Sequence, residues 1–452
     1  MFLLLNLQPV YKIEVKMIIN FSIQNFGSIK DRQTLSFEAD NSTHLEDAYV
    51  IKLGGHRILK LALIYGANAS GKTTVLKALN FLRQLVLEPE DIKTTELAFN
   101  PFLFDPITPE QSSILSLEFF QNDIKYFYEV EFLKKAIVSE ELYFHNPNKA
   151  NIFKRKTDLE KQFTEITFGN KISIKEIFKK TLESNTLWNN TVLGGYLKTN
   201  IDIKELQEVV DWFDKYLNPL MYSGTQLEGF VNSQIENKKV SKADVVSILK
   251  KADLNISDIV IKKEKKDLTL IDVFELLKKL SKVPNNDEIG ELDEKGMLTS
   301  VSFEHIVNDV KYTLPLKFES QGTKRYYGFA GLLALLIKNS TAFSIDELEA
   351  SLHPDLYLHF LLSFLLNSDK SQIIATTHNR EILDDKNIFR NDVIWFTDKQ
   401  ENCSTELYSL ADFDSSAVRN TTNILNAYKS GKLSATPNLG DTYIDLNHEK
   451  IY

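Results

Sequence analysis

Cysteine is almost missing from this sequence, because Cys403 is the single one among 452 residues. One cysteine excludes an internal disulfide framework and any zinc site built on paired cysteines. It is typical of a protein that works in the cytoplasm, and we expect that location here. No apolar run approaches the roughly 18 residues that a transmembrane helix needs, so we expect no membrane partner.

Positive charge is also in short supply. Lysine and arginine number 53 against 62 aspartates and glutamates, which gives a formal net charge of −9. This balance argues against a surface that coats nucleic acid or an anionic membrane, although it leaves room for a local basic groove. Because 452 residues exceed one ordinary hydrophobic core, the length predicts two or three domains or lobes.

The clearest motif is the segment GANASGKTT, which begins at Gly66. A glycine, four residues, then Gly71, Lys72 and Thr73 is the spacing of a Walker A phosphate-binding loop. An apolar run before the loop predicts a buried strand, and an amphipathic pattern after it predicts a helix. Lys72 is expected to reach the β- and γ-phosphates of ATP, and Thr73 to bind Mg²⁺. The predicted ATP-binding residues of the loop are Gly66, Asn68, Ser70, Gly71, Lys72, Thr73 and Thr74.

Two later apolar runs end in polar residues that suit ATP hydrolysis. The run 342–345 leads into Asp346 and Glu347, the pattern of a Walker B strand. We expect Asp346 to hold Mg²⁺ and Glu347 to orient or deprotonate the attacking water. The run 373–377 ends at His378. Because ligands of open α/β sheets bind at the carboxyl ends of the strands, His378 is predicted to contact the γ-phosphate or to hold the water and Glu347.

A second anion site is predicted in the segment ESQGTKRYYGFAGLLALLIKN. Its polar turn places Ser320 and Gly322 at the start of a helix that runs from about 324 to 337. One ATP does not need two such sites from one copy of a chain, but two copies that enclose ATP between them do. The sequence therefore predicts a homodimer with ATP at composite sites, and larger homo-oligomers remain open.

The order of these motifs resembles that of the ABC-type ATPases, which include Rad50, SMC and RecF proteins. In detail, the sequence resembles the bacterial AAA15-type ATPases, which include restriction-linked (RloA-like) and abortive-infection (AbiL-like) proteins. The likeness covers most of residues 17–437. The segments that carry it are INFSIQNFGSIKDRQTLSF, YGANASGKTTVLKAL, SEELYF, ESQGTKR, DELEASLHPDL, TTHNREIL and NILNAYKSGKLSATP.

The resemblance implies an α/β fold, namely an ABC-type P-loop NTPase with a mixed sheet, flanking helices, an antiparallel β-subdomain and a helical insertion. It assigns ATP and Mg²⁺ as cofactors and residues 349–354 as the loop that crosses to the partner. We expect an N-terminal ATPase lobe over 17–155, a mainly helical insertion over 156–296 and a C-terminal ATPase lobe over 297–452. The insertion lacks the sustained heptads of a long coiled coil.

The resemblance also implies a function, the sensor or regulatory scaffold of an anti-phage, abortive-infection system. Only 74 residues follow His378, with no metal cluster of the TOPRIM kind, so we expect a separately encoded effector, a TOPRIM-like nuclease. The alternative is a RecF/Rad50-like ATPase that binds DNA in repair or recombination. The 248 residues between Lys72 and Ser320 disfavour a compact transporter subunit.

Overall fold

The computed structural model describes residues 15–436, except 253, 266–296, 385–386 and 414–423. Its internal contacts divide the chain into two compact units. Unit 1 takes the residues up to 220, those of 343–346 and those from 373 onward, whereas unit 2 takes 221–342 and 347–372. Both predicted ATPase lobes thus contribute to unit 1.

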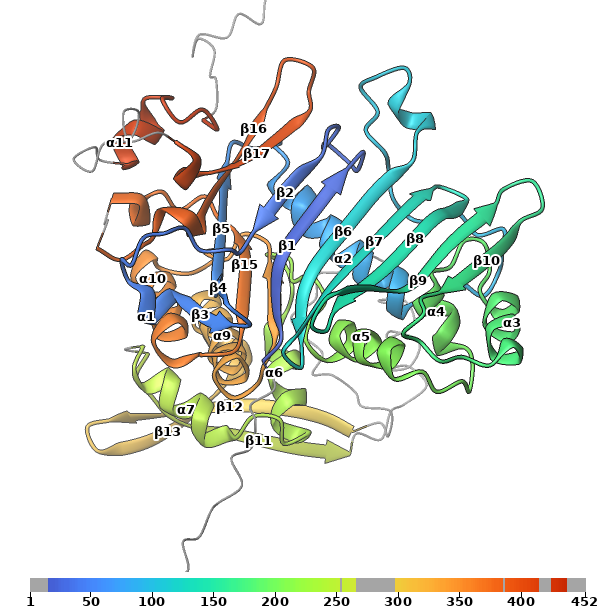
Figure 1. The fold of residues 1–452 in the computed structure, drawn as a ribbon. Helices are drawn as coiled ribbons and strands as arrows, with labels where there is room; N and C mark the ends of the chain where they lie inside the picture. The colour runs from blue at the N-terminus through green and yellow to red at the C-terminus, as the bar shows by residue number, and fades with distance from the viewer. Residues whose placement is uncertain (1–14, 253, 266–296, 385–386, 414–423, 437–452) are drawn as a thin grey trace, which may run out of the picture. The chain divides into compact units, whose positions relative to one another are not determined.

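The larger sheet of unit 1 has seven antiparallel strands in the order β10-β9-β8-β7-β6-β1-β2 (Figure 1). Alternate side chains are buried, as Tyr126, Tyr128 and Val130 of β7 are. This period of two is expected for a sheet with one covered face. The strands are β1 (Met17–Gln24), β2 (Gln33–Ser36), β6 (Ser113–Gln121), β7 (Ile124–Leu133), β8 (Ala136–His145), β9 (Lys149–Asp158) and β10 (Phe163–Phe168).

Helices cover one face of this sheet (Figure 1). They are α2 (Lys72–Leu87), α3 (Glu176–Asn185), α4 (Val192–Leu197) and α5 (Lys204–Lys215). The ring of Trp212 on α5 lies 4.3 Å from that of Phe119 on β6, and the ring of Phe213 lies 5.9 Å from that of Tyr128. Each buried aromatic side chain of this kind stabilises the unit by about 2–3 kcal/mol.

The smaller main sheet of unit 1 has five strands in the order β14-β15-β5-β16-β17. Strand β5 is paired in parallel with β15 and with β16, and β17 runs antiparallel to β16. All six residues of β5 are buried, as expected for the centre of a sheet covered on both faces. The strands are β5 (Leu61–Gly66), β14 (Ala342–Ile345), β15 (Gln372–Thr376), β16 (Ile394–Lys399) and β17 (Thr405–Ser409).

Shorter elements complete unit 1. They are α1 (Glu46–Tyr49), the hairpin of β3 (Val50–Leu53) and β4 (His56–Leu59), α11 (Ile424–Lys429), and the 3₁₀ turns η1 (Thr108–Glu110), η3 (Glu381–Asp384), η4 (Asn391–Val393) and η5 (Leu410–Asp412).

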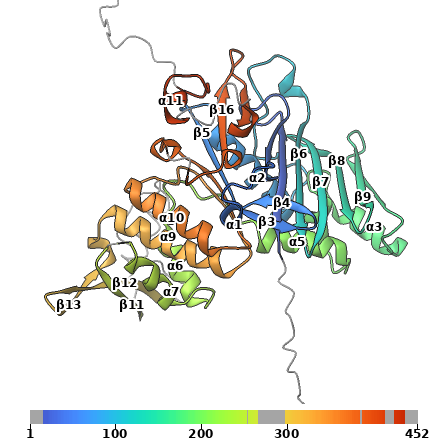
Figure 2. The ribbon, with the colours of Figure 1, turned by 60° about the vertical axis from the view of Figure 1, so that its left-hand side comes forward.

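Among its described residues, unit 2 joins four helices to a three-stranded antiparallel sheet in the order β11-β12-β13 (Figure 2). Gly328 and Gly331 of the central helix α9 face α6, and a Cβ added at either would press on Leu227 or Val231. The two helices therefore approach closely only because these positions lack side chains. The elements are α6 (Leu227–Glu236), α7 (Lys242–Lys250), α9 (Gln321–Lys338), α10 (Pro354–Asn367), β11 (Ile256–Lys265), β12 (Met297–Val307), β13 (Val310–Pro315) and η2 (Leu316–Phe318).

The unit boundaries differ from the domain boundaries expected from the sequence. Residues 156–220 belong to unit 1, where β10 extends the seven-stranded sheet and α3 to α5 cover it. Only the later part of the expected insertion belongs to unit 2, where it includes strand β11 besides α6 and α7. Amphipathic periodicity predicts a helix but not the surface that its apolar face covers. Of the described helices, none is both long and apolar enough to cross a membrane.

Candidate nucleotide-binding site

The Walker A segment forms a tight loop between β5 and α2, in a conformation that requires glycine. Gly71 immediately precedes α2 and has a φ of +104°, in the region that disfavours residues with a Cβ. A Cβ at Gly71 would press on the side chains of Thr405 and Ser28, and one at Gly66 on Thr397. The backbone at these two glycines thus packs directly against the neighbouring side chains. The N–H groups at the start of α2 form a cradle for an anion.

Hydroxyl groups from outside the loop hold its conformation through hydrogen bonds. Ser70 Oγ lies 2.6 Å from Thr397 Oγ1 of β16, and the Thr405 hydroxyl donates to the Ser70 carbonyl at 2.8 Å. Thr405 Oγ1 also lies 2.7 Å from Ser28 Oγ, which lies 3.0 Å from Thr74 Oγ1. These bonds preorganise the loop. The sequence motif identified Ser70 and Thr74 but not their three partners, because those come from distant segments.

Lys72 is buried at the first position of α2. Its ammonium group donates to the carbonyl oxygens of Gly66 and Ala67, each at 3.0 Å. The charge is therefore held at the loop itself, where a polyphosphate would need it. Asn68 is exposed at the tip of the same loop.

The carboxylate of Asp346 follows β14 and accepts hydrogen bonds from two hydroxyl groups. Thr73 Oγ1 lies 3.0 and 3.2 Å from its two oxygens, and Thr376 Oγ1 of β15 lies 2.6 Å from Oδ1. Asp346 is only 9% exposed. A hydroxyl group beside a buried carboxylate provides hard oxygen ligands, so these residues fit Mg²⁺. Thr376 is a contact that the sequence motifs did not identify, although it lies at the end of a predicted strand.

Glu347 and His378 both lie at strand ends and are both exposed. Glu347 directly follows Asp346 and has a φ of +52°. A non-glycine residue in this region costs about 1–3 kcal/mol, and such strain is concentrated at functional sites. His378 comes two residues after β15, and the preceding N–H, that of Thr377, still donates to Ile64 of β5 at 3.1 Å. Asp346 and His378 belong to unit 1, whereas Glu347 belongs to unit 2.

The predicted second anion site lies in unit 2, at the start of α9. Ser320 is exposed and caps the helix, because its hydroxyl oxygen accepts the N–H of Thr323 at 3.0 Å. Gly322 lies in the first turn, where a Cβ would come within 3.3 Å of the Ser351 carbonyl oxygen. The helix begins at Gln321, about three residues before the start expected from the sequence, so Gly322 lies within the helix and not in a preceding turn.

A comparison with known protein families matches the part of the chain that contains these motifs. The profile of the family described as "AAA domain, putative AbiEii toxin, Type IV TA system" matches residues 61–384. That span is 324 of the 452 residues and runs from β5 past His378. The chain belongs to this AAA-domain family. No curated protein matches the sequence.

Solved structures of SMC heads match this AAA-domain protein at low identity. The "SMC head domain from Thermotoga maritima" has 13% identity and a TM-score of 0.40, and the match covers 87% of this chain and 98% of that one. An Smc head bound to the C-terminal domain of ScpA, derived from Pyrococcus furiosus, has 10% identity and a TM-score of 0.39, with 87% and 96% covered. At these scores, the ABC-type P-loop fold is assigned from the strand order, the loop and the family. The narrower likeness to AAA15-type, RloA-like and AbiL-like proteins stays a prediction.

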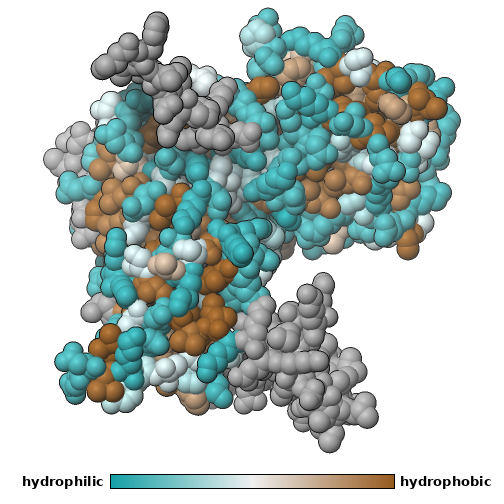
Figure 3. Space-filling model, turned by 90° about the horizontal axis from the view of Figure 1, so that it is seen from below, coloured by the Kyte–Doolittle hydropathy of each residue, from teal (hydrophilic) through white to brown (hydrophobic). Residues whose placement is uncertain are grey.

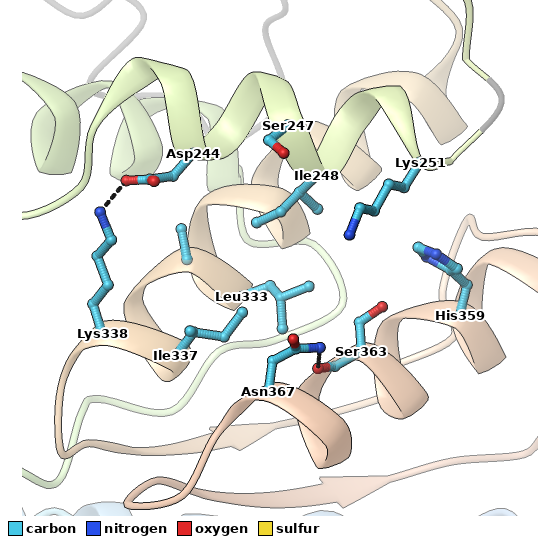
Figure 4. Close-up of a pocket in the computed structure, with 11 residues that line it drawn as sticks. Asp244, Ser247, Ile248, Lys251, Leu333, Ile337, Lys338, His359, Ser363 and Asn367 are labelled. Atoms are coloured by element: carbon cyan, nitrogen blue, oxygen red, sulfur yellow. Dashed lines mark hydrogen bonds and ion pairs between the residues drawn. The ribbon is translucent and has the colours of Figure 1, made fainter.

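A separate pocket of this AAA-domain protein lies in unit 2, among α7, α9 and α10 (Figure 4). Its volume is about 200 Å³. Lys338 and Asp244 form an ion pair at one end, and Lys251 and His359 lie at the other. Partial burial and the positive charge of Lys251 lower the pKa of His359. None of the predicted nucleotide-binding residues lines this pocket.

Proposed function

We propose that this protein binds and hydrolyses ATP as an ABC-type switch, and that two copies close around the nucleotide. The observation that carries the proposal is the arrangement of Thr73, Asp346 and Thr376 beside a glycine cradle that holds Lys72. Membership in an AAA-domain family supports ATP as the ligand. The exposed cap at Ser320 supports a second copy, because it offers a further anion site on the other unit.

Each residue has a distinct task in this proposal. Lys72 and the N–H groups of the loop hold the β- and γ-phosphates, and Thr73 and Asp346 provide ligands for Mg²⁺. When bound, Mg²⁺ neutralises charge that accumulates on the phosphate oxygens during hydrolysis. Glu347 accepts a proton from water as the water oxygen bonds to the γ-phosphorus, and His378 orients the γ-phosphate.

Hydrolysis then controls assembly. The bond from the γ-phosphorus to the bridging oxygen breaks, and ADP and phosphate are the products. In the proposed dimer, Ser320 and Gly322 of the second copy contact the γ-phosphate. Loss of that phosphate removes their partner, so the closed dimer loosens. ATP that binds the closed dimer more tightly than the open form shifts the equilibrium toward the closed dimer, and the size of the shift is set by that difference in affinity.

We further propose a role in abortive infection, as the sensor or scaffold for a separately encoded nuclease-like effector. The printed family description, which refers to AbiEii and to type IV toxin–antitoxin systems, supports this context. The competing hypothesis is a DNA-repair clamp that binds nucleic acid directly. The net charge of −9 disfavours it, because non-specific DNA binding depends on cationic side chains.

The test begins with Glu347→Gln, which keeps the shape of the side chain but removes the proposed base. We expect this variant to bind ATP and dimerise, with hydrolysis lowered at least about 100-fold. Glu160→Gln, in the exposed turn between β9 and β10 at the edge of the seven-stranded sheet, is the matched control and should hydrolyse at the wild-type rate. Normal hydrolysis by Glu347→Gln would refute the assignment of the base.

The biological role is tested by what co-purifies with tagged Glu347→Gln from its native host in ATP and Mg²⁺. A stoichiometric nuclease-like protein supports the defence proposal. Nucleic acid alone, released by salt, contradicts it and favours the repair-type clamp.

A further inference from the structure

The hairpin of β12 and β13 in unit 2, together with the turn η2 that follows it, carries several exposed apolar side chains. We call five of them, all within residues 307–318, the apolar strip. Their exposed fractions range from 37% at Leu314 to 66% at Phe318. Apolar colour appears over this hairpin at the lower left of Figure 3. The strip consists of Val307, Val310, Tyr312, Leu314 and Phe318.

Strand alternation places most of the strip on one face of the hairpin. Val310, Tyr312 and Leu314 are separated by single residues, so their side chains point to the same side. Val307 is the cross-strand partner of Val310 and shares that face. Ile306, which is 44% exposed, is paired with Lys311 and lies on the opposite face.

The hairpin is firmly attached to the start of α9. His305 of β12 lies 2.8 Å from the Glu319 carboxylate, next to Ser320. The ring of Phe303 lies 5.3 Å from that of Tyr327 on α9, and both residues are fully buried. The strip and the cap at Ser320 are therefore parts of one rigid piece of unit 2.

No residue between the strip and the cap is buried. Within residues 310–321, every residue except Leu316 and Glu319 is exposed. The sheet also ends at β13, so the outer edge of this strand has no neighbouring strand among the described residues. Exposed apolar patches and open strand edges are characteristic of surfaces that bind another chain.

We propose that the apolar strip packs against a second copy of this chain when ATP closes the dimer. The inference rests on the proposed function, in which Ser320 and Gly322 contact the nucleotide of that second copy. Because the strip runs without a covered break into Ser320 and is rigidly attached to it, a chain that reaches Ser320 also meets the strip. Burial of the strip then contributes hydrophobic stabilisation to the closed state alone.

The experiment compares two charge substitutions on the same hairpin, both in the Glu347→Gln background. Tyr312→Lys places an ammonium group within the strip, and Ile306→Lys places the same group on the opposite face. Dimerisation with ATP and Mg²⁺ is measured by sedimentation velocity over a range of protein concentrations. Nucleotide affinity is measured separately, and the circular dichroism of each variant is compared with that of the parent to check that the fold is retained.

We expect Tyr312→Lys to weaken ATP-dependent dimerisation at least 10-fold, with ATP affinity of the monomer unchanged, and Ile306→Lys to weaken it less than 3-fold. Equal dimerisation by Tyr312→Lys and its Glu347→Gln parent would overturn the inference and leave the ATP switch intact. Equal weakening by both substitutions would also overturn it, because the effect would not depend on the face.

Two further outcomes separate the inference from the proposed function. A Glu347→Gln parent that binds ATP but stays monomeric refutes the proposed dimer, whatever the hairpin variants do. A Tyr312→Lys variant that dimerises normally but loses a co-purifying protein assigns the strip to that protein and overturns the inference.

Discussion

Replacement of Gly71 by alanine should damage the phosphate loop more than the same change does at another glycine of positive φ. Gly71 has a φ of +104°, and its added Cβ would press on Thr405 and Ser28. Gly55, in the turn between β3 and β4, is a matched control. Its φ is +81°, but a Cβ there would meet nothing within 4 Å. Both lie in unit 1, so Gly55→Ala reports backbone strain alone and Gly71→Ala reports strain and collision together.

The structure gives a magnitude for each variant. A Cβ in the left-handed region costs roughly 1–2 kcal/mol, which is the whole effect expected for Gly55→Ala. At Gly71, the collision also displaces hydroxyl groups that make three hydrogen bonds, namely Thr405 to Ser70, Thr405 to Ser28, and Ser28 to Thr74. Each bond contributes about 1 kcal/mol, so Gly71→Ala should lower the free energy of unfolding by about 4–5 kcal/mol in all.

Tryptophan fluorescence during urea unfolding measures the difference. The three tryptophans, Trp188, Trp212 and Trp395, all lie in unit 1, so their signal follows the unit that contains both glycines. Gly71→Ala should also lose ATP binding, whereas Gly55→Ala should retain it. If the two variants lower the free energy of unfolding equally, the hydroxyl contacts do not hold the loop in the way described.

Two other substitutions test the metal site and a buried charge. Asp346→Asn keeps the size of the side chain and its ability to form hydrogen bonds but removes the negative charge. Mg²⁺-dependent ATP hydrolysis should therefore fall at least about 100-fold. An unchanged dependence of the rate on Mg²⁺ would contradict the role of Asp346 as a metal ligand. Burial raises the pKa of Glu140 from 4.5 to about 7, although Arg155 opposes the shift. The folded state then retains a proton that the unfolded state releases, so the free energy of unfolding falls as pH rises from 4.5 through 7, by at most about 3 kcal/mol. Urea unfolding at pH 5 and at pH 8 measures this decline in the free energy of unfolding. Glu140→Gln should show a smaller decline than the wild type, and an identical decline in both would refute the role of Glu140.

Local patterns were sufficient to predict the parts of the fold that surround the phosphate loop. The apolar run 61–65 predicted a buried strand, and β5 is fully buried. The run after Gly71 predicted an amphipathic helix, and α2 buries Leu76, Leu79 and Leu82. Such predictions succeed because burial on both faces of a strand, or on one face of a helix, leaves a short-range periodicity in the sequence.

Contacts between distant segments could not be predicted in this way. Thr397 and Thr405 meet at the loop because β16 lies beside β5 and β17 lies beside β16, whereas Ser28 comes from the turn that follows β1 in the other sheet. A single serine or threonine outside the motif does not indicate such a contact in the sequence. The division of the expected insertion was hidden for the same reason, since α5 belongs to unit 1 through the packing of Trp212 on Phe119.

The division into units places the proposed tasks of hydrolysis on different bodies. Asp346 is bound by Thr73 and Thr376 within unit 1, and the next residue, Glu347, belongs to unit 2 together with Ser320. In the proposed mechanism, the metal ligand is thus fixed to the phosphate loop, whereas the base is carried by the body that contacts the second copy. Asp346 and Glu347 are consecutive residues, so one peptide joins the metal ligand to the proposed base, and Glu347 has a left-handed φ at that point. In the proposed mechanism, Ser320 of the second copy contacts the γ-phosphate only in the dimer. We therefore expect a substitution in the apolar strip to alter the rate of hydrolysis per bound ATP as well as the affinity of the dimer.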